Sequence, residues 1–461
     1  MNAAEILKTS IMKFVSNNIT YILLAIVLLI FNCNSDKKSK PIIEQTSQEL
    51  TEDQLLDSVQ KQTFNYFWEG GEPNSGMARE RIHLDNIYPQ NDQDIVTTGG
   101  TGFGLMAILV GVERKFITRE QALERFERIV DFLETADRFH GAWSHWIDGK
   151  TGKIKPFSKK DTGGDLLETA FLVQGLLTVG EYYKSGNERE RQLVSKINQL
   201  WREVEWDRYT KNGEDVLYWH WSPTDGWDMN FPVVGYNECL IMYVLAAASP
   251  TYPIDKSVYD KGWAKSGAIV SKDSLYGEAL VLNHENDPIG PLFWAHYSYL
   301  GLNPQGLKDQ YADYWKVTQN HAKIHYKYAV DNPKKFKGYG DSLWGLTSSY
   351  SIKGYNGHRP GNDHGVISPT AALSSFPYTP QESMHMSKYL YKVQDSLIGK
   401  YGPFDAFSLQ YNWYVPRYLA IDQGPIVVMI ENYRSGLLWD LFMKNEDVQN
   451  GLKRLGFTFG S

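Results

Sequence analysis

The sequence predicts an all-α protein folded as an (α/α)6 barrel, a toroid of six helical hairpins with long aromatic loops on the cleft face. From Thr51 onward, helix signals are numerous and strand signals are few. The predicted helices alternate between apolar segments that follow long aromatic loops and amphipathic, charged segments that follow short loops. A helix that is hydrophobic all round is buried, so we expect an inner ring of apolar helices inside an outer ring of amphipathic ones. Their irregular spacing argues against a solenoid of short identical repeats.

The amphipathic helices are predicted from apolar periodicity and from their N-terminal caps. Thr118 and Gln121 form one capping box, and Thr379 and Glu382 form a second. The expected ranges are 51–68, 122–135, 188–204, 307–329, 379–397 and 446–455.

The apolar helices are predicted from long runs without charge and from glycine or proline near their starts. Ser368 with Pro369 is an N-cap followed by proline at the first helical position. The starts are expected near Gly99, Asp165, Asn237, Gly290, Ser368 and Pro425. The last of these helices is expected to run to about Met443, and a short strand is expected within 216–221.

Composition narrows the classes of function. The chain has 461 residues, 42% hydrophobic and 22% charged, which is ordinary for a globular protein. A net charge of −7 without a long basic run makes nucleic acid an unfavoured partner. Aromatic residues reach 14%, and many tryptophans lie in loops, where they serve either core packing or stacking on flat apolar faces such as sugar rings. This loop set is Trp143, Trp146, Trp219, Trp221, Trp227 and Trp413.

The N-terminus resembles an export signal. Residues 21–31 are apolar, follow Lys8 and Lys13, and are too few to span a bilayer comfortably. They lead to Cys33, so residues 1–33 resemble a lipoprotein signal with Cys33 as the lipidated residue, although Asn32 departs from the usual small residue. Met12 is an alternative start, and a plain secretion signal is the other interpretation. We therefore expect export to the periplasm or outer membrane, a flexible tether over 34–50 and a folded domain over 51–461.

Five acids lie at or just before the predicted starts of apolar helices, which would gather at one face of the toroid. They are Asp161, Asp165, Glu168, Glu238 and Asp422. An acid in an apolar wall has a raised pKa and can hold a proton near neutral pH, which a general acid requires.

Each acid also has a structural interpretation. Asp165 and Glu168 have the spacing of a capping box, and Asp422 is placed to cap the helix expected at Pro425. Glu238 is placed to complement a helix dipole, but its neighbours are too apolar for a solvated role. We expect Glu431, inside the last apolar helix, to pair with Arg434.

Two other patterns are given structural interpretations. His321 and His325 are four residues apart, but adjacent lysines indicate a solvated helix face, and no histidine or cysteine spacing predicts a metal site. The glycine-rich segment 99–104 lacks the Gly-Lys-Ser/Thr of a phosphate loop, so tight approach of a helix start to the ring axis is favoured. The segment 344–364 has the composition of a sugar-contacting loop or of an ordinary Ω-loop.

Five motifs in order resemble glycoside hydrolase family 144, the bacterial β-1,2-glucanases. They are DIVTTGGTG at 94–102, DTGGDLLETA at 161–170, GYNE at 235–238, WGLTSS at 344–349 and AIDQGP at 420–425. The resemblance implies an (α/α)6 barrel that cleaves β-1,2-glucan or its oligosaccharides with inversion and without a cofactor. It implies Glu238 as general acid, Asp422 on the base side and Asp165 and Glu168 as further pocket acids, to which we add Asp161. The family includes endo- and exo-acting enzymes.

We expect a monomer whose partner is the glucan. Its substrate-binding residues are predicted to be Trp143, His220, Trp221, Trp344, Arg359, Asp363 and Trp413. Two other functions stay open at this point: a polysaccharide lyase on the same toroid, and a non-catalytic glycan-binding lipoprotein.

Overall fold

The computed structural model describes residues 50–284 and 288–460. The predicted signal peptide, Cys33, Met12 and nearly all of the tether lie outside these residues. The chain from Leu50 to Ser461 forms one compact unit. Among the helices described in it, none combines the length and the apolar character needed to cross a bilayer.

Buried helices occupy the middle of this unit, as the apolar runs predicted. They are α3 (Thr98–Glu113), α5 (Leu166–Tyr183), α7 (Leu240–Ala248), α10 (Pro369–Leu373) and α13 (Ala420–Arg434). The 3-10 turns η4 (Leu292–Ala295) and η5 (Ser298–Leu300) stand where a helix was expected from Gly290. Helix α3 packs between α5 and α13, α5 contacts α7, and η5 contacts both α7 and α13, so the contacts close on themselves.

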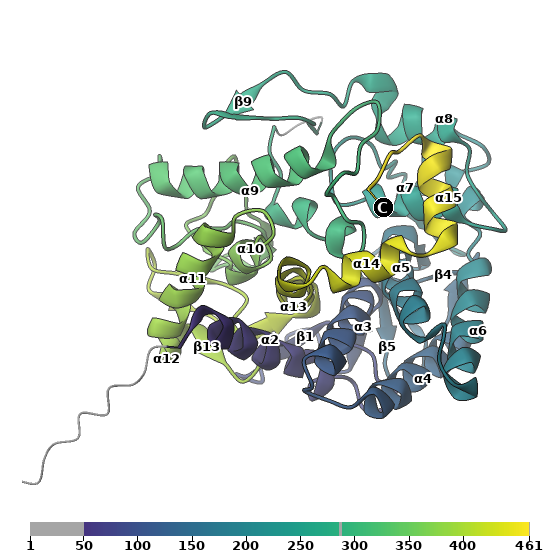
Figure 1. Ribbon diagram of the computed structural model, residues 1–461, viewed down its shortest axis with the longest axis horizontal. Helices are drawn as coiled ribbons and strands as arrows, with labels where there is room; N and C mark the ends of the chain where they lie inside the picture. Colours follow the sequence, from purple (N-terminus) through teal and green to yellow (C-terminus); the bar gives the residue numbers. More distant parts are fainter. Residues whose placement is uncertain (1–49, 285–287, 461) are drawn as a thin grey trace, which may run out of the picture. The chain divides into compact units, whose positions relative to one another are not determined.

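Amphipathic helices cover this inner set. They are α2 (Glu52–Trp68), α4 (Arg119–Thr135), α6 (Glu188–Arg202), α9 (Tyr314–Asp331), α11 (Pro380–Lys392) and α15 (Glu446–Leu455). Helix α2 packs on α13, α6 on α5, α15 on α7, α9 on η4 and α11 on α10. In Figure 1, α13 is seen end-on near the middle and the amphipathic helices lie around it.

The predicted caps are confirmed at one helix and wrong at another. Thr118 and Gln121 form the reciprocal capping box that begins α4. Thr379 makes no side-chain cap to α11, because its hydroxyl donates to the carbonyl of Ser375 instead. Helix α11 ends at Lys392, and the separate short helix α12 (Gln394–Leu397) follows.

The last apolar helix differs from its predicted bounds at both ends. Helix α13 begins at Ala420, so Pro425 lies inside it rather than at its start. It ends at Arg434, and Gly436, with φ of 75°, begins the separate helix α14 (Leu437–Met443). That left-handed conformation is inexpensive for glycine and breaks the expected continuous helix.

Glycines let α3 and α5 approach each other closely. A Cβ atom on Gly102 would lie 2.0 Å from the carbonyl oxygen of Phe171, and one on Gly175 would lie 2.3 Å from that of Gly102. Backbone contact with α5 therefore explains the glycine at Gly102, and the expected close approach to the ring axis stays a prediction.

Short strands connect the helices and hold the loops above them. The paired sets are β1 (Arg81–His83) with β17 (Arg417–Leu419), β2 (Ile95–Thr97) with β5 (Trp146–Asp148) and β6 (Ile154–Lys155), β3 (Arg138–Phe139) with β4 (Ala142–Trp143), β7 (Gly164–Asp165) with β8 (His220–Trp221), β9 (Ser274–Leu275) with β10 (Glu278–Ala279), β11 (Ser348–Ser349) with β12 (Asn356–Gly357), β13 (Ile398–Gly399) with β14 (Gly402–Pro403), and β15 (Phe407–Ser408) with β16 (Trp413–Tyr414). All these pairs are antiparallel. Strand β8 confirms the strand expected within 216–221.

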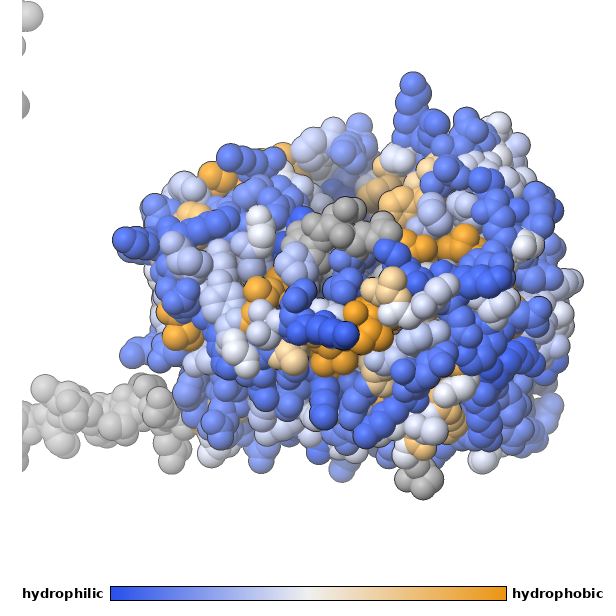
Figure 2. Space-filling view, turned by 90° about the horizontal axis from the view of Figure 1, so that it is seen from above, coloured by the Kyte–Doolittle hydropathy of each residue, from blue (hydrophilic) through white to orange (hydrophobic). Residues whose placement is uncertain are grey.

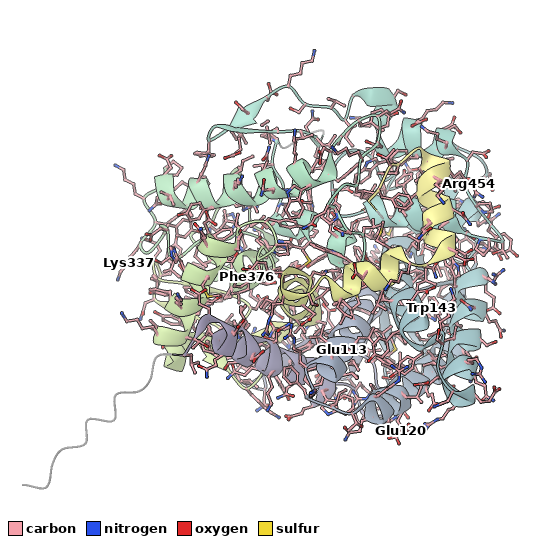
Figure 3. All side chains as sticks on the ribbon, viewed as in Figure 1. Glu113, Glu120, Trp143, Lys337, Phe376 and Arg454 are labelled. Atoms are coloured by element: carbon pink, nitrogen blue, oxygen red, sulfur yellow. The ribbon has the colours of Figure 1, made fainter. Side chains whose placement is uncertain are left out.

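Charged and apolar side chains separate between the surface and the interior. Figure 3 places Phe376, which is buried, near α10, whereas the exposed Glu120 and Lys337 lie at the periphery. Figure 2 shows a largely hydrophilic face with a few hydrophobic residues gathered toward its middle.

The predicted ion pair of the last inner helix is wrong. Glu431 pairs with Arg114, the residue that follows α3, at 2.7 Å, while Arg434 reaches Asp57 of α2 at 2.6 Å. Both arginines thus tie α13 to neighbouring helices instead of stabilising a contact within one helix.

Candidate active site

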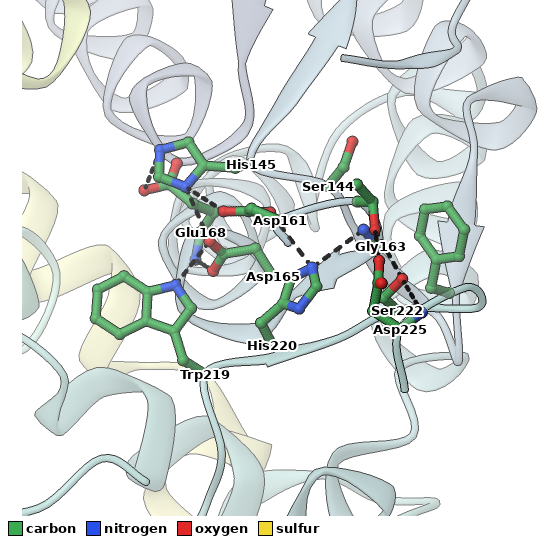
Figure 4. A network of polar contacts seen from close by, with 12 residues as sticks. Ser144, His145, Asp161, Gly163, Asp165, Glu168, Trp219, His220, Ser222 and Asp225 are labelled. Atoms are coloured by element: carbon green, nitrogen blue, oxygen red, sulfur yellow. Dashed lines mark hydrogen bonds and ion pairs between the residues drawn. The ribbon is translucent and has the colours of Figure 1, made fainter. Parts of the chain in front are cut away.

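Three of the predicted acids surround one histidine. Nδ1 of His145 lies 2.9 Å from Asp165 Oδ2 and 3.8 Å from Asp161 Oδ2, and its Nε2 lies 3.9 Å from Glu168 Oε1. His145 comes from the loop before β5, Asp165 ends β7 and Glu168 lies in the first turn of α5. Figure 4 shows the four side chains converging.

Local structure fixes these acids. Asp165 caps α5 by accepting the backbone N–H of Glu168 at 2.9 Å, and it also accepts the indole N–H of Trp219 at 2.7 Å. The carboxylate of Glu168 does not reach back, because it accepts the backbone N–H of Gly99 at 2.7 Å, at the start of α3. The predicted cap is confirmed for Asp165, while the second half of the capping box is replaced by a contact between two inner helices.

The electrostatics of this group favour a charged imidazole. Burial lowers the pKa of His145, but Glu168, Asp165 and Asp161 together raise it to about 10. Burial raises the pKa of Asp161 and of Glu168 to about 7, with a further contribution from Asp165, while His145 opposes both shifts. Ligand atoms of His145, Asp161 and Asp165 lie within 4.8 Å of one another, but a metal ion there would have to displace the proton that already supplies the positive charge.

Glu238 occupies an apolar wall, as predicted. It is 8% exposed and lies in the turn before α7, which begins at Leu240 rather than at Asn237. The Asn237 side chain accepts the backbone N–H of Cys239 at 2.9 Å, and the Ser298 hydroxyl donates to the Glu238 carbonyl. Burial raises the pKa of Glu238 to about 7, so a substantial fraction is protonated at neutral pH.

Asp422 is one half of a buried acid pair. It is 1% exposed, lies in the first turn of α13 and is hydrogen-bonded to Asp405. Burial raises the pKa of Asp422 well above its usual value, and Asp405 raises it further. Burial raises the pKa of Asp405 to about 6, and its Oδ2 accepts the backbone N–H of Tyr350 at 2.7 Å. Two adjacent buried carboxyls share a proton, so the pair carries about one negative charge.

A buried tyrosine connects the acid groups. Within the described residues, the hydroxyl of Tyr297 has no hydrogen-bond partner. Burial raises its pKa well above the usual value, and the charges of Asp422, Glu238 and Glu168 raise it further. Burial raises the pKa of the Cys239 thiol well above its usual value, and the charges of Glu238 and Asp165 raise it further. Tyr297 is therefore within electrostatic reach of Asp422, Glu238 and Glu168.

Two predicted tryptophan contacts with substrate are wrong. Trp143 and Trp344 are fully buried, and their indole N–H groups donate to the carbonyls of Leu133 and Glu382. A ring without an exposed face packs the core and cannot stack on a sugar.

Two further predicted binding residues have structural partners. The carboxylate of Asp363 accepts the hydroxyl of Tyr328 on α9 and that of Tyr339, each at 2.8 Å, so both of its oxygens are engaged with the protein. His220 is buried, and its Nε2 accepts the backbone N–H of Gly163 at 3.0 Å and lies 3.3 Å from Asp161. The predicted sugar contacts of Asp363 and His220 therefore stay predictions, for residues that the structure shows to be buried and engaged with the protein. Trp221, Arg359 and Trp413 are partly exposed, and their predicted role stays a prediction.

The histidine pair on α9 is not solvated, contrary to the prediction. His321 and His325 are buried, and the Nε2 of each lies 2.9 Å from the carbonyl oxygen of Gly290. Burial lowers the pKa of both rings, which keeps them neutral and suits hydrogen bonding to a loop carbonyl.

Sequence reasoning missed Asp405 and Tyr297. Asp405 lies between short strands and away from any helix start, so no periodicity marks it. Tyr297 lies in the 3-10 region between η4 and η5, where tyrosine is unremarkable among so many aromatic residues.

Comparison with known proteins identifies the family to which the chain is similar. A family model described as "Putative glucoamylase" matches residues 230–446. An exo β-1,2-glucooligosaccharide sophorohydrolase (non-reducing end) of Parabacteroides distasonis is 43% identical over 443 residues, covering 91% of this chain. The chain spans 60% of the length of that curated relative.

Solved structures match over nearly their whole length. An endo-β-1,2-glucanase of Chitinophaga pinensis, in complex with sophorotriose and glucose, is 60% identical with a TM-score of 0.87, covering 89% of this chain and 99% of that one. A protein described as a putative glucoamylase of Bacteroides caccae is 58% identical with a TM-score of 0.88, covering 89% and 100%.

Proposed function

Because the chain belongs to glycoside hydrolase family 144, the bacterial β-1,2-glucanases, we propose that it hydrolyses β-1,2-glucan or β-1,2-gluco-oligosaccharides. The observation that carries the proposal is the acid arrangement: a buried, partly protonated Glu238 and Asp422, which pairs with Asp405, both raise the pKa of the buried Tyr297 hydroxyl. A proton donor and an anionic group across one cleft are the two components that glycoside hydrolysis requires.

In this proposal, Glu238 donates its proton to the glycosidic oxygen as the bond to the anomeric carbon breaks. Asp422, with one negative charge shared with Asp405, accepts a proton from the attacking water, directly or through a substrate hydroxyl or a second water. Attack from the opposite face inverts the anomeric carbon, for which carboxyl groups about 6.5–9.5 Å apart leave room for water. Asp161, Asp165 and Glu168 form the adjoining wall, with His145 neutralising part of their charge.

The finer architecture and the cellular location are also proposals. The closed sequence of inner contacts and the outer helices support an (α/α)6 toroid. We infer that the protein is a monomer, anchored by a lipid on Cys33 in the periplasm or outer membrane. Mass spectrometry of the mature N-terminus tests the anchor: a diacylglycerol-modified Cys33 supports it, whereas an unmodified cleaved N-terminus contradicts it.

Product analysis tests the activity. The wild-type protein is incubated with linear β-1,2-glucan beside a panel of α- and β-glucans, and we expect products from β-1,2-glucan alone. Glu238→Gln and Asp422→Asn should each lose turnover by about 100-fold or more while glucan binding persists. Glu124→Gln, on the exposed face of α4, is the control and should keep full turnover.

Other outcomes identify the alternatives. An unsaturated product that absorbs in the near ultraviolet indicates a lyase. Binding of β-1,2-glucan without hydrolysis indicates a glycan-binding protein. Near-normal turnover in both acid variants contradicts the assignment of Glu238 and Asp422.

A further inference from the structure

A depression of about 380 Å³ lies beside the acid pair but contains none of the proposed catalytic acids. Its lining residues come from the loop after β11, from β16 and β17, and from the segment after β1. They include Tyr350, Ile352, Trp413, Tyr414, Arg417 and Asp85.

The lining combines exposed apolar side chains with a paired charge. Tyr414 is 37% exposed and Ile352 44% exposed, and Trp413 is partly exposed beside them on β16. Arg417 pairs with Asp85 at 2.8 Å, and both side chains stay partly accessible. Flat amphipathic rings and a few fixed polar groups are the features by which a pocket holds a sugar unit, whose faces are apolar and whose edge carries hydroxyls.

Two residues of the depression hold the acid pair in place. The backbone N–H of Tyr350 donates to Asp405 Oδ2 at 2.7 Å, and the backbone N–H of Asp405 donates to the carbonyl of Arg417 at 2.9 Å. Two lining residues of the depression therefore contact Asp405, the partner of Asp422, through their backbones.

An exposed tyrosine, Tyr355, contacts the lining residue Tyr350. Tyr355 is 52% exposed, and its ring meets that of Tyr350 edge-on with centroids 6.4 Å apart. Burial of its hydroxyl raises the pKa of Tyr355 well above the usual value, and the charges of Asp422 and Asp405 raise it further. Aromatic surface thus continues from the lining residue Tyr350 to Tyr355.

We propose that this depression is an accessory subsite that binds a glucosyl unit of a β-1,2-linked chain beyond the units held at the acids. The inference rests on the proposed function and deepens it, because it makes chain length a determinant of affinity. A long glucan reaches the subsite, whereas a trisaccharide held at the acids leaves it empty.

The test compares chain lengths in matched variants. Tyr414→Ala removes an exposed ring of the depression, and Tyr411→Ala removes another exposed ring, 48% exposed, from the same hairpin but outside the lining. We expect Tyr414→Ala to raise the ratio of KM for polymeric glucan to KM for sophorotriose by roughly 2- to 10-fold, the value of one aromatic contact. Tyr411→Ala should leave that ratio unchanged. An equal ratio in the two variants overturns the subsite.

Ile352→Ser is a second variant, in case Tyr414→Ala does not fold, and thermal unfolding reports on folding in each. Titration of polymeric β-1,2-glucan into the Glu238→Gln protein, with and without Tyr414→Ala, separates the two proposals. If wild-type protein does not hydrolyse the glucan, the proposed function fails. Weaker binding caused by Tyr414→Ala still supports the subsite, and unchanged or absent binding overturns it.

Discussion

Replacing Glu238 by glutamine should change the pH dependence of stability in a defined way. Burial raises the pKa of this carboxyl in the folded protein from 4.5 to about 7. Between these values the folded state binds a proton that the unfolded state has lost, so the free energy of unfolding falls as pH rises. Because one pKa unit is worth about 1.4 kcal/mol, this pKa difference lowers the free energy of unfolding by about 3 kcal/mol at pH 8 and leaves it nearly unchanged at pH 4.

Glutamine keeps the shape and removes the ionisation. As the pH rises from 4 to 8, the free energy of unfolding of Glu238→Gln should therefore increase by about 3 kcal/mol relative to that of the wild type. For a chain of this size, that is a relative rise in Tm of about 4 °C, measurable by differential scanning calorimetry.

Glu431→Gln is the matched control, because its effect on stability should depend on pH in the opposite direction. Although burial disfavours the charge of Glu431, hydrogen bonds from Arg114, Ser435 and Gln60 lower its pKa below the usual value. The stability that Glu431 contributes is present above the unfolded pKa and is lost as pH falls through the folded pKa, so glutamine there should destabilise more at pH 8 than at low pH. Parallel pH dependence in wild type and Glu238→Gln would refute a neutral buried acid at position 238.

Three further substitutions test the surrounding geometry. His145→Gln leaves buried acids without their cation and should lower the free energy of unfolding at pH 7 by about 3 kcal/mol, measured by urea denaturation; no loss would contradict a charged His145. Asp405→Asn removes the carboxyl that raises the pKa of Asp422, so the acidic limb of the kcat/KM profile should move to lower pH, and an unmoved limb would show that Asp405 does not set that ionisation. Trp344→Ala should cost about 3–5 kcal/mol of stability, and a change confined to KM would restore the sugar-contacting interpretation.

The sequence predicted the caps and the buried or exposed nature of a helix wherever residues close in the chain determine them. The capping box at Thr118, the uncharged run of α7 and the cap at Asp165 depend on neighbours within a few residues. The start of α13 was misplaced because Pro425 is normally a starting residue, yet the helix already begins at Ala420.

The candidate site was predictable only in part, because its partners come from distant segments. Isolated acids in apolar surroundings made Glu238 and Asp422 candidates. The pairing of Asp422 with Asp405, and of Glu431 with Arg114, depends on tertiary packing that leaves no periodic signal. The same limit explains Trp143, since a loop tryptophan on the surface and one folded into the core have the same local sequence.

The anomeric form of the first product tests the central claim most directly. Proton NMR follows the reducing ends released from linear β-1,2-glucan during the first minutes, before mutarotation equilibrates them. The proposed use of Glu238 and Asp422 on opposite faces predicts that the α-anomer appears first, and that Glu238→Gln releases almost none. Initial release of the β-anomer, or equal release by the variant, would contradict it.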